Sequence, residues 1–192
     1  MIHTHSLGRA TRYFPERTAL VSGERRLTFR ELHDRVGRIA AALSRQGFGN
    51  RDRLAILLPN EPEYIELVYA CAWLRVIAVP LNTRLSLTEI DHVLADAKPR
   101  GLIRHSSLPN PAVQVSQQVV LDQEPLDIGE ATCPAPIYDP QAVLALIYTS
   151  GTTGRPQGVE VTHANILENV YHTTFWLPYC EDSVHLLSLI HI

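Results

Sequence analysis

The 192-residue sequence predicts an α/β protein whose parallel sheet is built from βαβ layers. Short, continuous apolar runs alternate with amphipathic stretches from residue 28 onward. Continuous apolar runs are typical of strands buried on both faces, and apolar residues at helical spacing indicate helices that cover them. Because strand and helix alternate, the units should be right-handed crossovers between parallel strands.

The first helix is predicted to begin after Thr28, since Thr28 and Glu31 have the spacing of a capping box. Gly47 is a suitable C-terminal stop. One stripe of apolar residues follows helical spacing: Leu32, Val36, Ile39, Ala40 and Leu43. The next run, "RLAILL" at 53–58, predicts a buried strand.

A second helix is predicted after this strand, with Asn60 as its cap, Pro62 in its first turn and Glu63 three residues after the cap. Its aromatic residues Tyr64 and Trp73 are expected in the core. The segment "VIAVP" then predicts the second strand.

Another capping box, Ser86 with Glu89, precedes the helical pattern "IDHVLADA". The third strand is predicted at "GLIR", residues 101–104. Residues 105–141 are rich in proline and acidic side chains, which predicts an irregular surface connection with a weak strand at "QQVVLD".

Regular patterns return at "AVLALIYTS", an apolar strand that leads directly into a loop of small residues. A short strand at "GVEV" follows, and Thr162 is predicted to cap a helix over "HANILENVYHTTFW". The segment "SVHLLSLI" predicts one more strand.

Composition excludes several classes of protein. The 17 basic and 20 acidic residues give a net charge of −3, so nucleic acid is not expected as the main partner. Cys71, Cys133 and Cys180 are too far apart for a disulfide framework or a zinc knuckle. The N-terminus lacks a signal-peptide core, and Glu66 and Arg75 interrupt the longest apolar region, so no transmembrane segment is expected. These features favour a cytoplasmic protein.

The loop "TSGTTGRPQG" at 149–158 has the composition of a phosphate-binding loop. Glycines allow backbone N–H groups to approach an anion closely, and the hydroxyl side chains add further donors. The loop also follows a strand, where ligands bind in open α/β sheets. Neither the Walker pattern nor G-x-G-x-x-G is present. The alternative is a glycine-rich turn without a ligand.

The sequence from Tyr148 to Val159, with Thr162 and His163, closely resembles the signature of the adenylate-forming (AMP-dependent synthetase/ligase) superfamily, Y-T-S-G-T-T-G-x-P-K-G-V. The resemblance covers nearly the whole chain and is strongest to acyl-CoA synthetases that act on fatty acids. It implies that this chain is an incomplete N-terminal part, residues 1–192, of the large domain of such an enzyme. The parent would join a carboxylic acid to AMP from ATP and then to coenzyme A.

The resemblance also implies which residues would bind the ATP phosphates: Thr149, Ser150, Gly151, Thr152, Thr153, Gly154 and Gln157. Thr149 would lie near Mg²⁺, and His191 would lie beside the acyl pocket. The residues with which the family binds the acid and the adenine and forms the thioester lie later in its sequences and have no counterpart here, so the isolated chain is expected to be inactive. The resemblance also allows a peripheral association of the parent with membranes.

Two residues depart from the family pattern. Gln157 replaces the usual lysine, which removes a charge-assisted bond worth about 1.5–3 kcal/mol and could weaken phosphate binding by ~10- to 100-fold. Arg75 stands where the family often has glycine. Gln157 and the short chain motivate an alternative, a non-catalytic binding or regulatory protein; a peptide-synthetase adenylation domain is a further alternative.

The remaining candidate side chains have simpler interpretations. His163 is expected to bond locally at a helix start rather than to act as a base. Tyr171, Phe175 and Trp176 follow helical spacing and are expected to pack. His3 and His5 are expected at a frayed terminus. The other histidines before residue 191 show no metal spacing: His33, His92, His105, His172 and His185.

Residues 187–192, "LSLIHI", have two interpretations. They resemble the family's "LPLFHI" stretch, and they also match the translation of an adapter end used in sequencing libraries. On the second interpretation the sheet would be cut before its remaining strands, which predicts an exposed edge and aggregation on expression.

Overall fold

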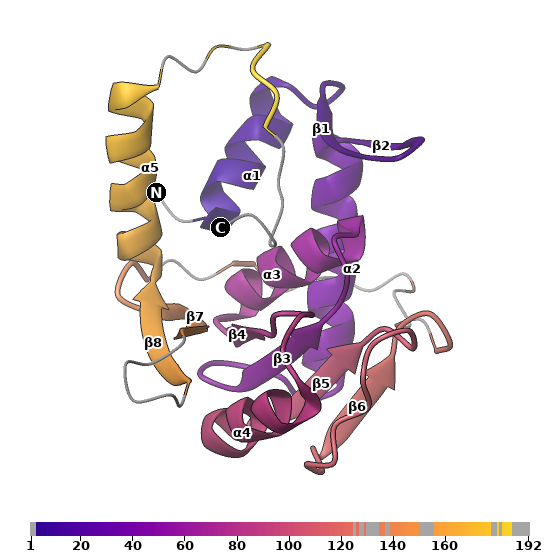
Figure 1. The fold of residues 1–192 in the computed structure, drawn as a ribbon. Coiled ribbons are helices and arrows are strands. Elements are labelled where there is room, and N and C mark those ends of the chain that lie inside the picture. The colour runs from indigo at the N-terminus through magenta and orange to yellow at the C-terminus, as the bar shows by residue number, and fades with distance from the viewer. Residues whose placement is uncertain are drawn as a thin grey trace.

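The computed structural model describes residues 3–124, 126, 129, 135–136, 139–149, 156–177, 180 and 182–185. Its main sheet has the order β6-β5-β3-β4-β7-β8 (Figure 1). The strands are β3 (Arg53–Leu57), β4 (Ile77–Pro80), β5 (Gly101–Arg104), β6 (Gln117–Val120), β7 (Val143–Thr149) and β8 (Gln157–Thr162). Every neighbouring pair is parallel except β7 and β8. The predicted α/β fold with a parallel sheet is therefore confirmed, with one antiparallel strand at its edge.

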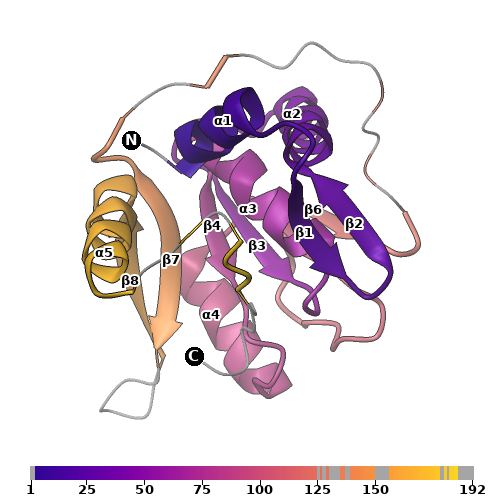
Figure 2. The same cartoon turned by 90° about the horizontal axis from the view of Figure 1, so that it is seen from above.

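Helices cover both faces of this sheet (Figure 2). Helices α1 (His3–Tyr13), α2 (Phe29–Arg45) and α3 (Pro62–Leu74) share one buried cluster, and α4 (Leu87–Ala97) forms the other. The chain steps from β3 to β4 through α3, and then back past β3 to β5 through α4. Crossovers between parallel strands are right-handed in nearly all proteins, which explains why opposite steps place the two helices on opposite faces.

The predicted helix starts are largely confirmed. Capping boxes are present at Thr28, Ser86 and Thr162, which start α2, α4 and α5 (His163–Trp176). Gly47 follows α2 with a φ of 84°, a conformation that glycine adopts without strain. These signals act over three residues of chain, so the sequence alone specifies them.

The prediction that Asn60 caps α3 is wrong. The N-cap residue is Glu61, which has an extended backbone and no side-chain cap bond. Pro62 explains the difference, because proline fits the first helical position and disfavours helical backbone at the residue before it. The predicted core positions Tyr64 and Trp73 are confirmed as buried.

Two elements precede those that the sequence predicts. His3 begins α1, so the backbone expected to fray is helical. Leu7 on this helix is 3% exposed, and the Thr11 hydroxyl donates to the carbonyl oxygens of Leu7 and Phe29. An antiparallel hairpin of β1 (Thr18–Ser22) and β2 (Arg25–Thr28) follows. Neither element has a long apolar pattern, and α1 is stabilised by tertiary contacts instead.

The connection predicted at 105–141 contains β6, which pairs with β5 at the position where "QQVVLD" suggested a strand. The strand predicted at "SVHLLSLI" lies mostly outside the described residues; 183–185 are described and are not in a strand. None of the helices that the structure describes combines the length and apolarity needed to cross a membrane.

Candidate phosphate-binding site

Strands β7 and β8 form an antiparallel hairpin whose tip is the predicted phosphate loop. Thr149 is the last residue of β7, and it is paired with Gln157, the first residue of β8. The two ends of the loop therefore lie side by side at the carboxyl end of β7. Residues Ser150, Gly151, Thr152, Thr153 and Gly154 lie outside the described residues, as does His191.

The chemistry of the two described ends fits a phosphate group. Thr149 and Gln157 are both exposed. Neither side chain forms a hydrogen bond with the part of the chain that the structure describes. The Thr149 hydroxyl and the Gln157 amide can therefore both donate to phosphate oxygens. The threonine oxygen is also a suitable ligand or water partner for Mg²⁺.

His163 lies at the start of α5 and is 3% exposed. Its backbone N–H donates to the carbonyl oxygen of Ala142, and the next N–H, of Ala164, donates to that of Pro140. Burial lowers the pKa of His163, although Asp139 acts in the opposite direction. His163 thus lies at the predicted helix start, and its backbone bond ties α5 to the start of β7. Its side-chain Nδ1 is buried and has no hydrogen-bond partner among the described residues, so a local side-chain bond is not observed, and the absence of a base role stays a prediction.

The prediction that the aromatic residues of α5 pack is wrong. Tyr171 is 51% exposed, Phe175 is 81% exposed and Trp176 is 78% exposed. Figures 1 and 2 show α5 beside β8 at one end of the molecule, where its outer side faces no other described element. Helical spacing specifies which residues share a face, but it does not specify what covers that face.

No cluster of histidine, cysteine or acidic side chains in the described ranges could hold a metal ion. His33 lies instead against Trp73, with ring centroids 5.2 Å apart. His105 forms a hydrogen bond with Ser107 through Nδ1 at 2.7 Å.

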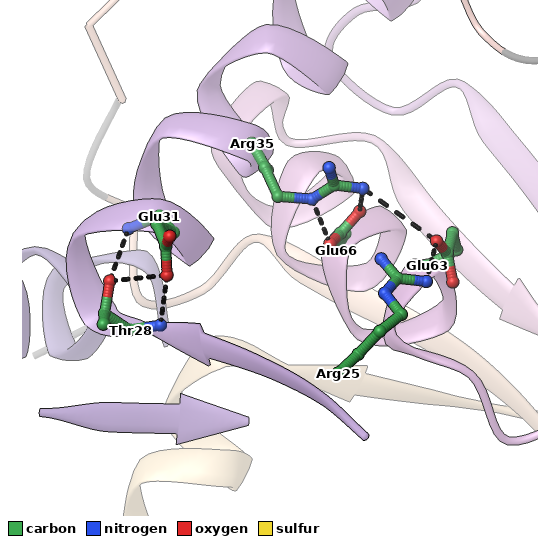
Figure 3. A network of polar contacts seen from close by, with 6 residues as sticks. All are labelled: Arg25, Thr28, Glu31, Arg35, Glu63 and Glu66. Carbon is green, nitrogen blue, oxygen red and sulfur yellow. Dashed lines mark hydrogen bonds and ion pairs between the residues drawn. The ribbon is translucent and has the colours of Figure 1, made fainter. Parts of the chain in front are cut away.

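A polar cluster that the sequence analysis did not identify joins β2, α2 and α3 (Figure 3). Arg35 on α2 donates to both oxygens of Glu66, at 2.6 and 3.0 Å, and the Glu66 side chain is fully buried. Arg25 donates to Glu63 at 2.8 Å. Burial acts to raise the pKa of Glu63, but Arg25 and Arg35 outweigh it, so the pKa lies below its ordinary value.

This cluster lines a cavity of about 370 Å³, together with His105 and Asp122. The arginines and glutamates neutralise one another, so the cluster is best explained as a brace between elements. The spacing of Glu63 and Glu66, three residues apart on a helix, is the only local signal that could have indicated it.

A family model described as AMP-binding enzyme matches residues 7–192. The chain belongs to the AMP-binding enzyme family. The similarity to this family is therefore not limited to the loop but extends over residues 7–192.

Relatives in the AMP-binding family include acid–CoA ligases. The chain is 37% identical to a feruloyl-CoA synthase of an Amycolatopsis species, over 94% of this chain and 37% of that protein. It is 35% identical to the 2-succinylbenzoate–CoA ligase of Bacillus velezensis, over 91% of this chain and 36% of that protein. The chain thus spans little more than a third of the length of these relatives.

Solved structures of the family show the same fold. O-succinylbenzoate coenzyme A synthetase from Bacillus subtilis in complex with AMP matches with a TM-score of 0.82 and 33% identity, over 94% of this chain and 47% of that chain. The same enzyme in complex with ATP and magnesium ion matches with a TM-score of 0.80 and 31% identity, over 94% of this chain and 48% of that chain.

Proposed function

We propose that this chain supplies the phosphate-binding part of an ATP-dependent carboxylic acid–CoA ligase. The observation that carries the proposal is the pairing of Thr149 with Gln157, which closes the signature loop at the end of a sheet strand in a chain of the AMP-binding family. The relatives named feruloyl-CoA synthase and 2-succinylbenzoate–CoA ligase support the reaction class.

In the proposed reaction, a carboxylate oxygen attacks the α-phosphorus of ATP. The bond to the bridging oxygen breaks, and pyrophosphate leaves with that electron pair. The sulfur of the coenzyme A thiol then attacks the acyl carbonyl carbon and its proton is released, while the bond from that carbon to the phosphate oxygen breaks and AMP leaves with the electron pair. The residues of this chain act in the first step, where hydroxyl and amide donors at the loop would stabilise the charge on the transferred and leaving phosphates.

The Thr149 hydroxyl would help to hold Mg²⁺, which when bound would supply positive charge to the phosphates. Ser150, Gly151, Thr152, Thr153 and Gly154 would contribute the remaining donors of the loop. His191 is retained as a candidate neighbour of the acyl group. The proposed location is the cytoplasm, where ATP and coenzyme A are both available.

The acid is proposed as a class only. The sequence resemblance favoured fatty acids, whereas the relatives named above act, by their names, on feruloyl and succinylbenzoate groups. A panel for testing should therefore contain ferulate, 2-succinylbenzoate and fatty acids of several lengths. We expect the 192 residues alone to bind the triphosphate without completing the thioester, since they correspond to 37% of feruloyl-CoA synthase.

The direct test of the ligase proposal is acid-dependent exchange of labelled pyrophosphate into ATP by a protein that carries this chain together with the rest of a ligase domain. Exchange that requires one acid of the panel would support the proposal. An absence of exchange with every acid would favour the second candidate, a non-catalytic nucleotide-binding protein, which the neutral Gln157 motivates.

The substitution Gln157→Lys tests the loop within this chain. A lysine would add a charge-assisted bond, so ATP should bind about tenfold more tightly in a titration calorimeter. Gln114→Lys, at another exposed position, adds the same charge away from the loop and serves as the matched control. Equal gains in both variants would show general electrostatic attraction and would contradict a specific role for residue 157.

A further inference from the structure

The Tyr148 side chain connects the hairpin of the candidate phosphate site to α4. Its hydroxyl donates to Oδ2 of Asp96, in the last turn of α4, at 2.5 Å. Fifty-two residues separate the two partners in sequence. Tyr148 directly precedes Thr149, so this contact lies one residue before the loop.

The same ring covers the other end of the loop. Tyr148 is paired with Gly158, and a Cβ atom at position 158 would lie 2.9 Å from Cζ of the ring and 3.1 Å from Oη. A side chain at Gly158 would therefore displace the ring. Glycine at this position is explained by the close approach of Tyr148.

The backbone connection between this hairpin and the rest of the sheet is short. The register between β4 and β7 consists of one residue pair, Ala78 with Ala145, in the described residues. The bond from Tyr148 to Asp96 adds a polar side-chain attachment on the loop side of that pair. A hydrogen bond to a carboxylate is stronger than one between neutral groups, so the attachment should resist opening.

Burial, the bond to Asp96 and the negative charge of Asp96 all raise the pKa of the Tyr148 hydroxyl, and the positive charge of Arg53 only partly opposes them. Tyr148 therefore remains a hydrogen-bond donor throughout the range in which proteins are normally studied.

We propose that Tyr148, held by Asp96 and lying over Gly158, is a positioning residue that fixes both ends of the phosphate loop in the geometry that binds a triphosphate. This inference rests on the proposed function for the ligand. The anchoring itself depends only on contacts between described residues.

The test uses the 192-residue chain, inorganic tripolyphosphate with Mg²⁺ as the probe, and titration calorimetry. Tyr148→Phe keeps the ring over Gly158 but removes the donor, and should weaken binding by about tenfold if one charge-assisted bond holds the loop. Asp96→Asn keeps a neutral acceptor and should have a smaller effect. The double variant should bind no more weakly than Tyr148→Phe, since both changes remove one interaction.

Tyr69→Phe is the matched control. Tyr69 lies on α3, is partly buried against the core, and forms a side-chain hydrogen bond with Ser6, far along the chain from the loop. It should lower the melting temperature as Tyr148→Phe does, and leave the dissociation constant unchanged. Equal dissociation constants for the wild-type chain and Tyr148→Phe would overturn the proposal.

Hydrogen exchange separates this proposal from the proposed function. If the wild-type chain does not bind tripolyphosphate, the ligand assignment fails, and the amides of Thr149 and Gly158 then decide the anchoring. Their exchange should be about tenfold faster in Tyr148→Phe and unchanged in Tyr69→Phe. Unchanged exchange in Tyr148→Phe would overturn the anchoring as well.

Discussion

Arg75 ends α3 with a φ of 57° and a ψ of 29°, in the left-handed region. This conformation costs most residues about 1–2 kcal/mol, and glycine adopts it without that cost. The structure thus gives a physical reason for the glycine that the family pattern often has here. The Arg75 side chain lies 3.8 Å from Asp139, and such a partly exposed ion pair contributes little in return.

We predict that Arg75→Gly will be more stable than Arg75→Ala by about 1 kcal/mol, because both lose the ion pair and only glycine relieves the backbone. Urea unfolding of the two variants measures the difference. Arg38 lies inside α2 and serves as the control position. There the glycine variant should be less stable than the alanine variant, since glycine is unfavourable in a helix. Equal stability of Arg75→Gly and Arg75→Ala would contradict the interpretation.

Burial of His163 should make stability depend on pH. The pKa of His163 is lowered from 6.5 in the folded chain, so the unfolded chain binds a proton first as the pH falls. The stability that His163 contributes is present above that ordinary value and is lost as the pH falls through the folded pKa. We predict that His163→Gln will flatten the fall in unfolding free energy between about pH 7 and pH 5.

Chemical denaturation at several pH values measures this slope. His172 lies on the same helix and is exposed, so His172→Gln controls for the loss of a histidine. A slope in His163→Gln that equals the wild-type slope would rule out His163 as its source.

At the scale of elements, prediction from sequence succeeds where the residues that determine an element lie close together in the chain. Two capping boxes, the cap at Thr162 and the apolar strands are specified within a few residues, and they were predictable. Helix α1 depends on contacts with distant parts of the chain, and the exposure of Phe175 depends on the absence of such contacts among the described residues. Neither feature was predictable from the sequence. The same holds for the candidate site. Its loop was predictable because it is a local sequence motif, whereas the contact between Tyr148 and Asp96 was not, because it forms only in the folded sheet.

Breaking the bond from Arg35 to Glu66 should strongly destabilise the packing of α2 against α3. Removing one partner leaves a buried charge unpaired, so Arg35→Met should cost about 3 kcal/mol. This value is at the low end for buried pairs because the Arg35 side chain is 33% exposed. The double variant Arg35→Met/Glu66→Leu buries no charge and should recover most of the loss.

Thermal and urea unfolding of both variants test this prediction. Arg30→Met is the matched control, because Arg30 forms an exposed ion pair with Glu16 and is worth little to stability. A double variant as unstable as Arg35→Met would mean that the ion pair itself, rather than the avoidance of an unpaired carboxylate, stabilises the helix packing.

At the scale of the whole molecule, α5 and the edge strand β8 leave apolar side chains uncovered. Phe175, Trp176 and Val159 are all exposed, and β8 is the last strand of the sheet. Exposed apolar faces and open strand edges promote association between molecules. We predict that the double variant Phe175→Ser/Trp176→Ser will lower aggregation of the 192-residue chain by about twofold or more.

Light scattering during expression and storage, with dye binding to apolar surface, measures this effect. Tyr13→Ser is the control, since Tyr13 is 63% exposed on α1, away from the edge strand. If the control and the α5 variant reduce aggregation equally, the α5 face is not its source. Aggregation that both variants leave unchanged would point to the open edge of β8.

The single registered pair between β4 and β7 also has a mechanical consequence. Parallel strands that share few backbone bonds separate more easily than the long antiparallel ladder that holds β7 to β8. Under load, the molecule should therefore divide along this seam. The hairpin would then detach with α5 as one piece, while the ladders of β3, β4, β5 and β6 remained intact.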